Sequence, residues 1–169
     1  MSFTRRFSLG LLAVCALSAA GVKAADQTVP FKGTWTGRTI SADLSTFPLV
    51  QIVATGAGQV AHFGATTMVS PHITDVTDGH TFGDQIFTAA NGDTLTAYCD
   101  GNPEVFGGGA LVIGTLACSV TGGTGRFEGA TGEYDFNFTA TLILDELPDV
   151  RYSTVATFDG SISNVGSSH

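Results

Sequence analysis

Hydrophobic and polar residues alternate along most of the chain, which is typical of β-strands with one buried and one solvated face. The clearest case is Gly132 to Leu144, where every second residue from Tyr134 onward is apolar and most of the residues between are polar. The opening segment, Phe31 to Ile40, places Phe31, Trp35 and Thr39 on one face and polar side chains on the other. Both segments are therefore predicted to be strands.

The same pattern predicts six further strands. They are expected near Leu49 to Ala54, Gln59 to Val69, Asp84 to Ala90, Thr94 to Cys99, Ala110 to Val120 and Val150 to Ile162. Asn91-Gly92 separates two alternating runs and is a strong hairpin signal. No segment after the first 24 residues shows sustained 3.6-residue periodicity with a cap at its start. The stretch from Ser70 to Gly83 is predicted to be mostly loop.

About eight strands joined by short turns predict an all-β fold, an eight-stranded antiparallel closed β-barrel of the calycin-like type. Residues 25–169 show no linker or shift in composition, so they are expected to form one domain. The interior of such a barrel holds packed side chains or one small ligand. A sandwich of two sheets is the alternative that this pattern leaves open.

The first 24 residues have the features of a secretory signal peptide. Arg5 and Arg6 precede an apolar run, and Val22-Lys23-Ala24 resembles a cleavage site. Cleavage after Ala24 predicts a secreted or periplasmic protein. It would leave four basic against 15 acidic residues, a net charge of −11 in place of the full chain's −8.

The composition of the remaining chain excludes several classes of partner. It contains no apolar run long enough for a membrane-spanning helix after residue 30, so no membrane insertion is expected once the signal is cleaved. Its acidic balance is a poor match to a polyanion, so no nucleic-acid partner is expected. Cleavage also leaves two cysteines, Cys99 and Cys118, for which an oxidising compartment predicts a disulfide.

A glycine-rich segment carries a family resemblance. Thr121 to Gly132 reads TGGTGRFEGATG and resembles a segment of the allene oxide cyclase and dirigent barrels. Together with Ala89 to Leu95, AANGDTL, it is also similar to a group of exported bacterial proteins with the same type of barrel. The glycines suit close backbone approach at a barrel corner, with Phe127 as a plug between them.

The resemblance implies an eight-stranded barrel with an apolar central cavity, and a homo-oligomer, since the plant members are often trimers. We expect Trp35, His62, Phe136 and Phe138 to line that cavity. If the protein is an enzyme, the resemblance implies an isomerase or cyclase of the allene oxide cyclase type. The plant enzymes use a carboxylate on the first strand, whereas Phe31 to Ile40 has none. That departure counts against the plant reaction.

His62 is the candidate catalytic residue, because histidine is the side chain suited to proton transfer at neutral pH and His62 alternates in phase with Val60 and Met68. The alternative is a hydrogen-bonded core histidine. His72 and His80 lie in the predicted loop and are expected to face solvent. The histidines lack the tight spacing of a zinc site, so no metal is expected. No nucleotide or flavin fingerprint occurs, so no cofactor is expected either.

Three functional hypotheses remain. The first is a non-catalytic carrier or scavenger that binds a small apolar molecule, lipid-like or phenolic, in the cavity. The second is a cyclase or isomerase that steers a reactive substrate in the same cavity. The third is a structural or surface-interaction protein with a packed interior. The volume and lining of the central cavity distinguish the third from the others.

Overall fold

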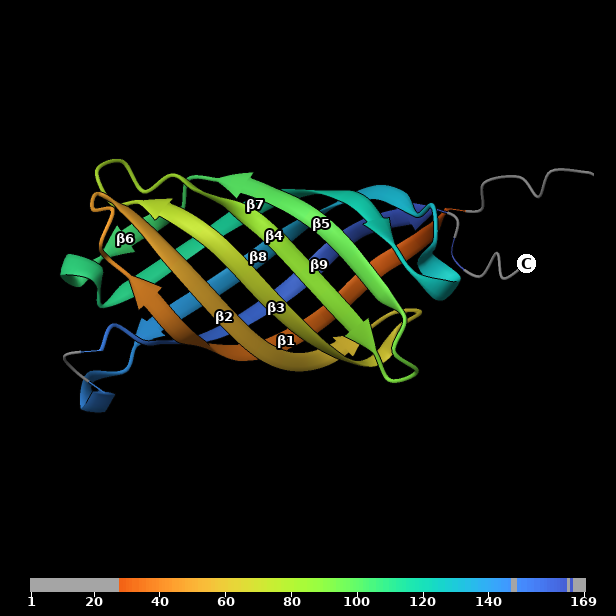
Figure 1. Ribbon diagram of the computed structural model, residues 1–169, viewed down its shortest axis with the longest axis horizontal. Helices are drawn as coiled ribbons and strands as arrows, with labels where there is room; N and C mark the ends of the chain where they lie inside the picture. The colour runs from red at the N-terminus through yellow and green to blue at the C-terminus, as the bar shows by residue number, and fades with distance from the viewer. Residues whose placement is uncertain (1–27, 147–148, 164, 166–169) are drawn as a thin grey trace, which may run out of the picture.

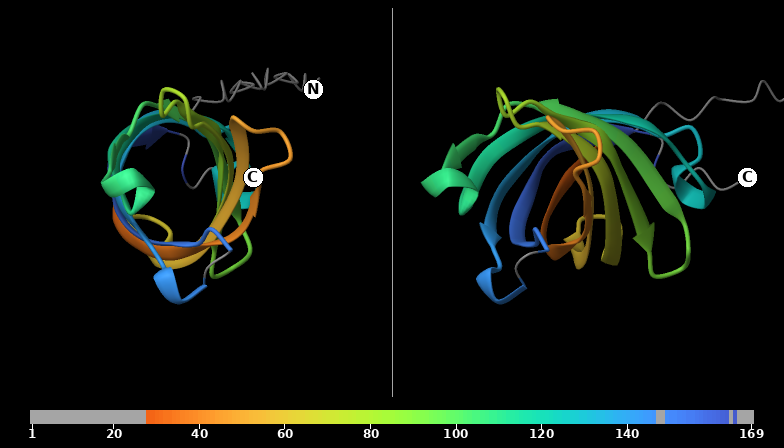
Figure 2. Two further views of the ribbon diagram at one scale, coloured as in Figure 1. Left: turned by 90° about the vertical axis from the view of Figure 1, so that its left-hand side faces the viewer. Right: turned by 60° about the vertical axis from the view of Figure 1, so that its left-hand side comes forward.

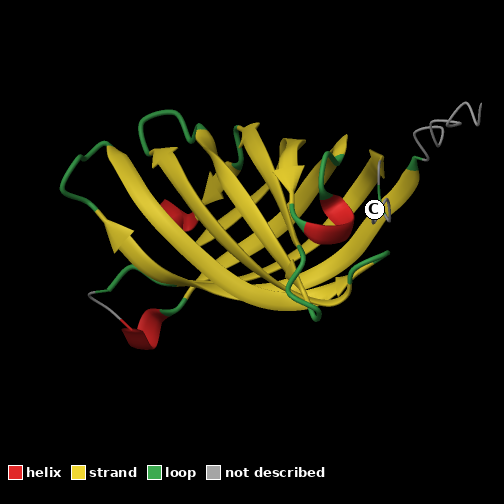
Figure 3. Cartoon of the chain, turned by 45° about the vertical axis from the view of Figure 1, so that its right-hand side comes forward, coloured by secondary structure: helices red, strands yellow, loops and turns green. Residues whose placement is uncertain are grey.

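The computed structural model describes residues 28–146, 149–163 and 165. The predicted signal peptide, residues 1–24, lies outside the described residues. The described part consists almost entirely of strands, with three short 3-10 turns, Gly107–Gly109 (η1), Gly125–Phe127 (η2) and Leu144–Glu146 (η3), at the ends of the barrel (Figure 3).

Nine strands form one antiparallel sheet that closes on itself (Figure 1). They are β1 (Val29–Asp43), β2 (Leu49–Val60), β3 (Gly64–Asp75), β4 (Thr81–Ala89), β5 (Thr94–Gly101), β6 (Glu104–Phe106), β7 (Leu111–Gly123), β8 (Thr131–Leu142) and β9 (Tyr152–Ser163). The order is β5-β4-β3-β2-β1-β9-β8-β7-β6, and pairing of β5 with β7 closes the ring. The three-residue β6 pairs only with β7, so the barrel proper has eight strands, as predicted. A closed ring excludes the two-sheet sandwich.

Strand β1 follows the predicted division into two faces. Phe31, Trp35 and Thr39 are buried, whereas Lys32 lies on the outer face and pairs with Asp159 of β9, Nζ to Oδ1 2.9 Å. The alternation in β8 is obeyed in the same way, with Tyr134 and Phe136 buried and Asp135 exposed. Viewed along its axis, the barrel is a closed ring of strands (Figure 2).

One end of the barrel is filled by aromatic side chains. Phe31 lies at the centre of this cluster, with ring centroids 4.7 Å from Tyr134 and 5.5 Å from Phe87. Phe158 also packs against Phe87, at 5.3 Å. These side chains are all nearly inaccessible to solvent. We call this end of the barrel, which also holds the β2–β3, β4–β5 and β7–β8 turns, the packed end.

The glycine-rich segment seals the packed end. Phe127 in η2 is fully buried and stacks on Phe63 at 4.0 Å, with an interplanar angle of 10°. Gly125 adopts a φ of +59°, and a Cβ there would collide with the carboxylate of Asp93. That carboxylate accepts hydrogen bonds from the Arg126 backbone N–H, at 3.3 Å, and the Asn91 side chain, at 2.7 Å. The predicted plug role of Phe127 agrees with this packing.

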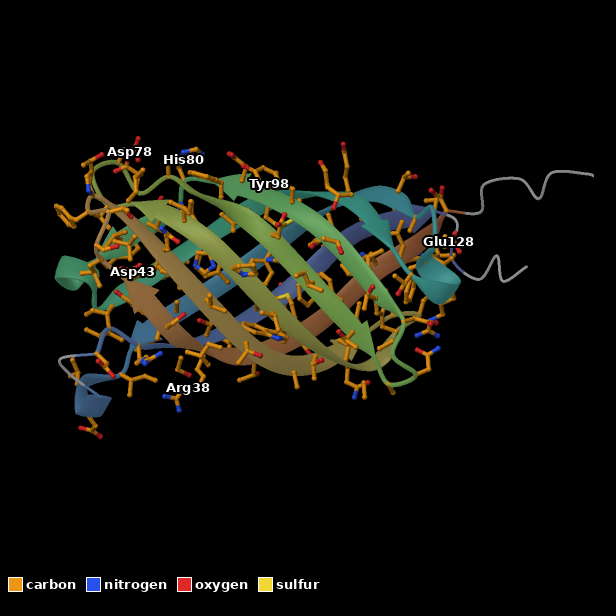
Figure 4. All side chains as sticks on the ribbon, viewed as in Figure 1. Arg38, Asp43, Asp78, His80, Tyr98 and Glu128 are labelled. Carbon is orange, nitrogen blue, oxygen red and sulfur yellow. A yellow bond between two sulfur atoms is a disulfide. The ribbon has the colours of Figure 1, made fainter. Side chains whose placement is uncertain are left out.

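The predicted disulfide is present. Cys99 of β5 and Cys118 of β7 are paired in register and bonded, and both side chains are buried inside the barrel. Tyr98, the neighbour of Cys99, correspondingly points outward and is exposed (Figure 4).

Two predictions of local structure are wrong. Gln59 to Val69 is not a single strand, because Ala61 to Phe63 form a tight turn between β2 and β3. Ser70 to Gly83 is not mostly loop, because β3 continues to Asp75 and β4 begins at Thr81. Polar residues and Pro71 obscure the alternation in that part of β3.

Candidate cavity

The half of the barrel beyond the aromatic cluster encloses a cavity of about 920 Å³. Trp35, Met68, Leu116 and Phe136 belong both to the packed core and to the cavity lining, so they form its floor. Its walls are mainly apolar or hydroxyl-bearing and include Val50, Ile52, Ala54, Val112, Phe138, Ala140, Thr39, Ser70 and Thr154. We call the opposite end of the barrel, where this cavity begins, the open end.

The mouth of the cavity is formed by loops with exposed apolar side chains. Leu44 and Phe47 come from the β1–β2 loop, and Val76 comes from the β3–β4 loop. Val105 and Phe106 of β6 complete this rim. Two acidic residues, Asp78 and Glu104, also line it, and Asp78 stands at the open end in Figure 4.

The cavity floor is organised around Trp35. Its indole occupies the space next to Gly37 of β1 and Gly56 of β2, where any Cβ would collide with the ring. It contacts Phe136 edge-on, with centroids 6.3 Å apart. The indole Nε1 is buried and has no hydrogen-bond partner among the described residues. Trp35, Phe136 and Phe138 are among the residues that line the cavity.

His62 lies elsewhere. It occupies the β2–β3 turn at the packed end, is exposed, and has a φ of +67°. The prediction that it sits mid-strand is wrong, because three residues reverse the chain here without an Asn-Gly or proline signal. His62 is not among the residues that line the cavity.

His72 is the histidine that lines the cavity. It lies on the inner face of β3, following Met68 and Ser70 at two-residue spacing. The expectation that it faces solvent is therefore wrong. Its Nδ1 lies 3.0 Å from the backbone oxygen of Ser70. Burial lowers the pKa of His72, and the hydrogen bond to Ser70 opposes that shift only in part.

The hydrogen bond of His72 fixes which ring nitrogen carries the proton. A carbonyl oxygen only accepts, so Nδ1 donates to it and Nε2 of the neutral ring is left as an acceptor. The Ser70 hydroxyl lies 3.5 Å from the same Nδ1. Because that nitrogen already carries a proton, it is not poised to activate Ser70 as a nucleophile. The pair is suited to binding rather than to acyl transfer.

A buried polar layer, formed by Gln85 and Tyr134, lies against the disulfide. The Tyr134 hydroxyl donates to Gln85 Oε1 at 3.0 Å and lies 3.9 Å from Cys99 Sγ. Burial raises the pKa of Tyr134 well above its usual value. Gln85 and Tyr134 do not reach the cavity surface, so this layer supports the floor from below.

The cavity contains few charges. Within residues 28–146, 149–163 and 165, its lining includes no lysine or arginine, and Asp78 and Glu104 supply its carboxylates. The carboxylate of Asp93 lies at the packed end, where it accepts hydrogen bonds from Asn91 and the Arg126 backbone, and it does not line the cavity. No group of three or more potential metal ligands gathers anywhere in the described chain, and no helix there is long and apolar enough to cross a membrane.

Comparison with known proteins adds a distant likeness in architecture. No family model and no curated protein matches this chain. A solved structure of the pterocarpan synthase dirigent protein GePTS1 superposes with a TM-score of 0.47 and 12% sequence identity, covering 87% of this chain and 98% of that one.

Proposed function

We propose that this protein is a carrier or scavenger that binds one small, mainly apolar molecule in the open half of its barrel. The observation that carries the proposal is the 920 Å³ cavity. Ligand sites in proteins typically enclose roughly 300–1,000 Å³ and combine apolar walls with a few polar groups. A protein with a packed interior would not hold such a space. Among the described lining residues no side chain forms a nucleophile with its base, so covalent catalysis is not part of this proposal.

We also propose that the chain is exported and works outside the cytoplasm. The buried Cys99–Cys118 disulfide is compatible with an oxidising compartment. Intact-mass analysis of the protein from the cell envelope and medium tests this. A chain that begins at Ala25 and carries the disulfide is expected, and a cytoplasmic protein that retains Met1 would contradict it.

The binding test uses Trp35, which is the only tryptophan of the chain and lies in the cavity wall. Titration with the neutral dye N-phenyl-1-naphthylamine should quench Trp35 emission in a saturable, one-to-one manner. Ala140→Phe, which places a ring in the cavity wall, is expected to weaken dye binding at least 10-fold.

Thr141→Phe provides the matched control. Thr141 is the next residue of β8 and lies exposed on the outer face, so this variant should bind the dye as the wild type does. Circular dichroism verifies that both variants fold, and Ala54→Phe on the opposite wall serves as a second blocking variant. Non-saturable quenching, or equal binding by blocked and control variants, would refute the proposal.

A further inference from the structure

We propose that His72 makes the cavity select neutral guests that carry a hydrogen-bond donor, such as an alcohol, a phenol or an amide, over carboxylates. This inference rests on the proposed function and names the chemical class of its ligand. It assigns a specificity-determining role to His72, which the sequence pattern predicts to face solvent.

The first support is the orientation of the imidazole. The Nδ1–H donates to the Ser70 backbone oxygen at 3.0 Å, which leaves Nε2 as a lone-pair acceptor. No residue of the described chain supplies a hydrogen bond to Nε2. Nε2 is not among the fully buried atoms that lack a partner, so it is open to the cavity, where a guest with an N–H or O–H group can donate to it.

The second support is that neighbouring polar groups are already hydrogen-bonded within the protein. Thr81 Oγ1 pairs with Thr74 Oγ1 at 3.0 Å and with the Gly79 backbone oxygen at 3.2 Å. The Tyr152 hydroxyl donates to the Gly109 backbone oxygen at 2.6 Å. These two hydroxyls of the cavity wall already have partners, whereas His72 keeps one open acceptor. The Trp35 indole Nε1, which also lacks a partner, is a donor and cannot accept a hydrogen bond from a guest.

The third support is the electrostatic surroundings. The residues paired with His72 on the adjacent strands are Ile52 of β2 and Gly83 of β4, and neither titrates. The other titratable groups that line the cavity are Asp78, Glu104 and Tyr152. A carboxylate guest would thus be desolvated next to two acids, with no cation in the described lining to compensate. Burial also keeps His72 neutral, since its pKa is lowered.

Three probes that share one ring system test the selection. They are 2-naphthol, which donates a hydrogen bond, 2-methoxynaphthalene, which does not, and 2-naphthoate, which is an anion. Their affinities are measured at pH 7.5 by displacement of the naphthylamine dye. One hydrogen bond predicts that 2-naphthol binds about 3- to 10-fold more tightly than the methyl ether. Naphthoate is expected to bind at least 10-fold more weakly than 2-naphthol.

Substitution of His72 assigns the effect to this side chain. His72→Leu removes the acceptor and should abolish the difference between 2-naphthol and the methyl ether. His72→Gln retains a carbonyl acceptor and should preserve part of it. The matched control is His62→Asn, in the exposed turn at the packed end, which should leave all three affinities unchanged.

Acid provides a readout that a merely structural role would not give. Protonation turns Nε2 into a charged donor, so acid should weaken 2-naphthol and strengthen naphthoate once the pH falls below the lowered pKa of His72. The pH response should disappear in His72→Leu.

The outcomes separate this inference from the proposed function. Equal binding of the ether and the alcohol, or a pH response that survives in His72→Leu, would overturn the role of His72 and leave a cavity that binds apolar molecules. Failure of every probe, the dye included, would overturn both. If His72→Leu does not fold, the wild-type pH response and His72→Gln decide the matter.

Discussion

Cys99 on β5 and Cys118 on β7 lie directly opposite each other, with Cα atoms 4.0 Å apart, and their disulfide joins the two strands that close the ring. Most neighbouring strands of the barrel are also consecutive in sequence. The two exceptions are β1 with β9, and β5 with β7, between which β6 lies in sequence. The crosslink therefore holds one of the seams where chain connectivity alone does not keep the strands together.

Removal of the disulfide should destabilise the protein but leave the cavity unchanged, because neither cysteine lines it. The two cysteines are 19 residues apart, and the chain-entropy treatment gives roughly 3 kcal/mol for a loop of that size. Urea unfolding of Cys99→Ala/Cys118→Ala against the oxidised wild type measures the loss. An unchanged unfolding midpoint would show that the β5–β7 seam needs no crosslink.

Gly37 should resist even the smallest substitution, because a Cβ there would meet the Trp35 indole and the Thr55 backbone oxygen. Overpacking of this kind costs about 1–3 kcal/mol. Gly37→Ala is expected to lower the free energy of unfolding by that amount and to shift the Trp35 emission. In a Trp35→Phe background the smaller ring should make the same change less costly. Additive effects in this double-mutant cycle would contradict the contact.

The buried Tyr134 should make the folded protein less stable at alkaline pH. Burial raises its pKa in the folded state above the value of about 10 typical of an unfolded chain. The unfolded state therefore loses its proton first, and folding stability, complete below pH 10, should fall as the pH rises above that value. Unfolding measured between pH 9 and 11 tests this, with Tyr134→Phe as the comparison. A variant that loses stability as steeply as the wild type would point to other groups.

Much of the architecture could be predicted because it depends on local sequence patterns. Alternation predicts β1 and β8, Asn91-Gly92 predicts a hairpin, and the two cysteines left by the expected signal cleavage predict the disulfide. Each of these signals involves residues that are close in sequence or few in number.

The division of the barrel into a packed and an open half could not be predicted in this way. It depends on which inward-facing residues share a level of the barrel. Bulky Phe31 and Phe87 meet at one end, whereas small Ala54 and Ala140 line the other. Those levels are set by strand register, and the missed turn at Ala61 to Phe63 left the register of β3 undefined. His72 falls in the predicted loop because polar residues and Pro71 obscure the alternation there.

The missed turn itself leads to a prediction about His62. Its φ of +67° is favourable for glycine and tolerable for asparagine, but a β-branched residue there is strained. His62→Val should lower the free energy of unfolding by roughly 1–2 kcal/mol, whereas His62→Asn should be close to neutral. Thermal unfolding compares the two variants. Equal stability of both would mean that the turn relaxes to another conformation.

His72 should also make the folded protein sensitive to mild acid. Its pKa in the folded state is lowered by burial, whereas an unfolded histidine titrates near 6.5. Below that pH the unfolded chain binds a proton that the folded state resists, so stability is complete above about pH 6.5 and falls as the pH decreases. The aspartates whose pKa values are lowered, Asp43 and Asp75, act in the same direction but only at lower pH, below about 4. Unfolding free energies between pH 7.5 and 5 should therefore decline in the wild type and remain nearly level in His72→Phe. A parallel decline in both proteins would place the acid-sensitive group elsewhere.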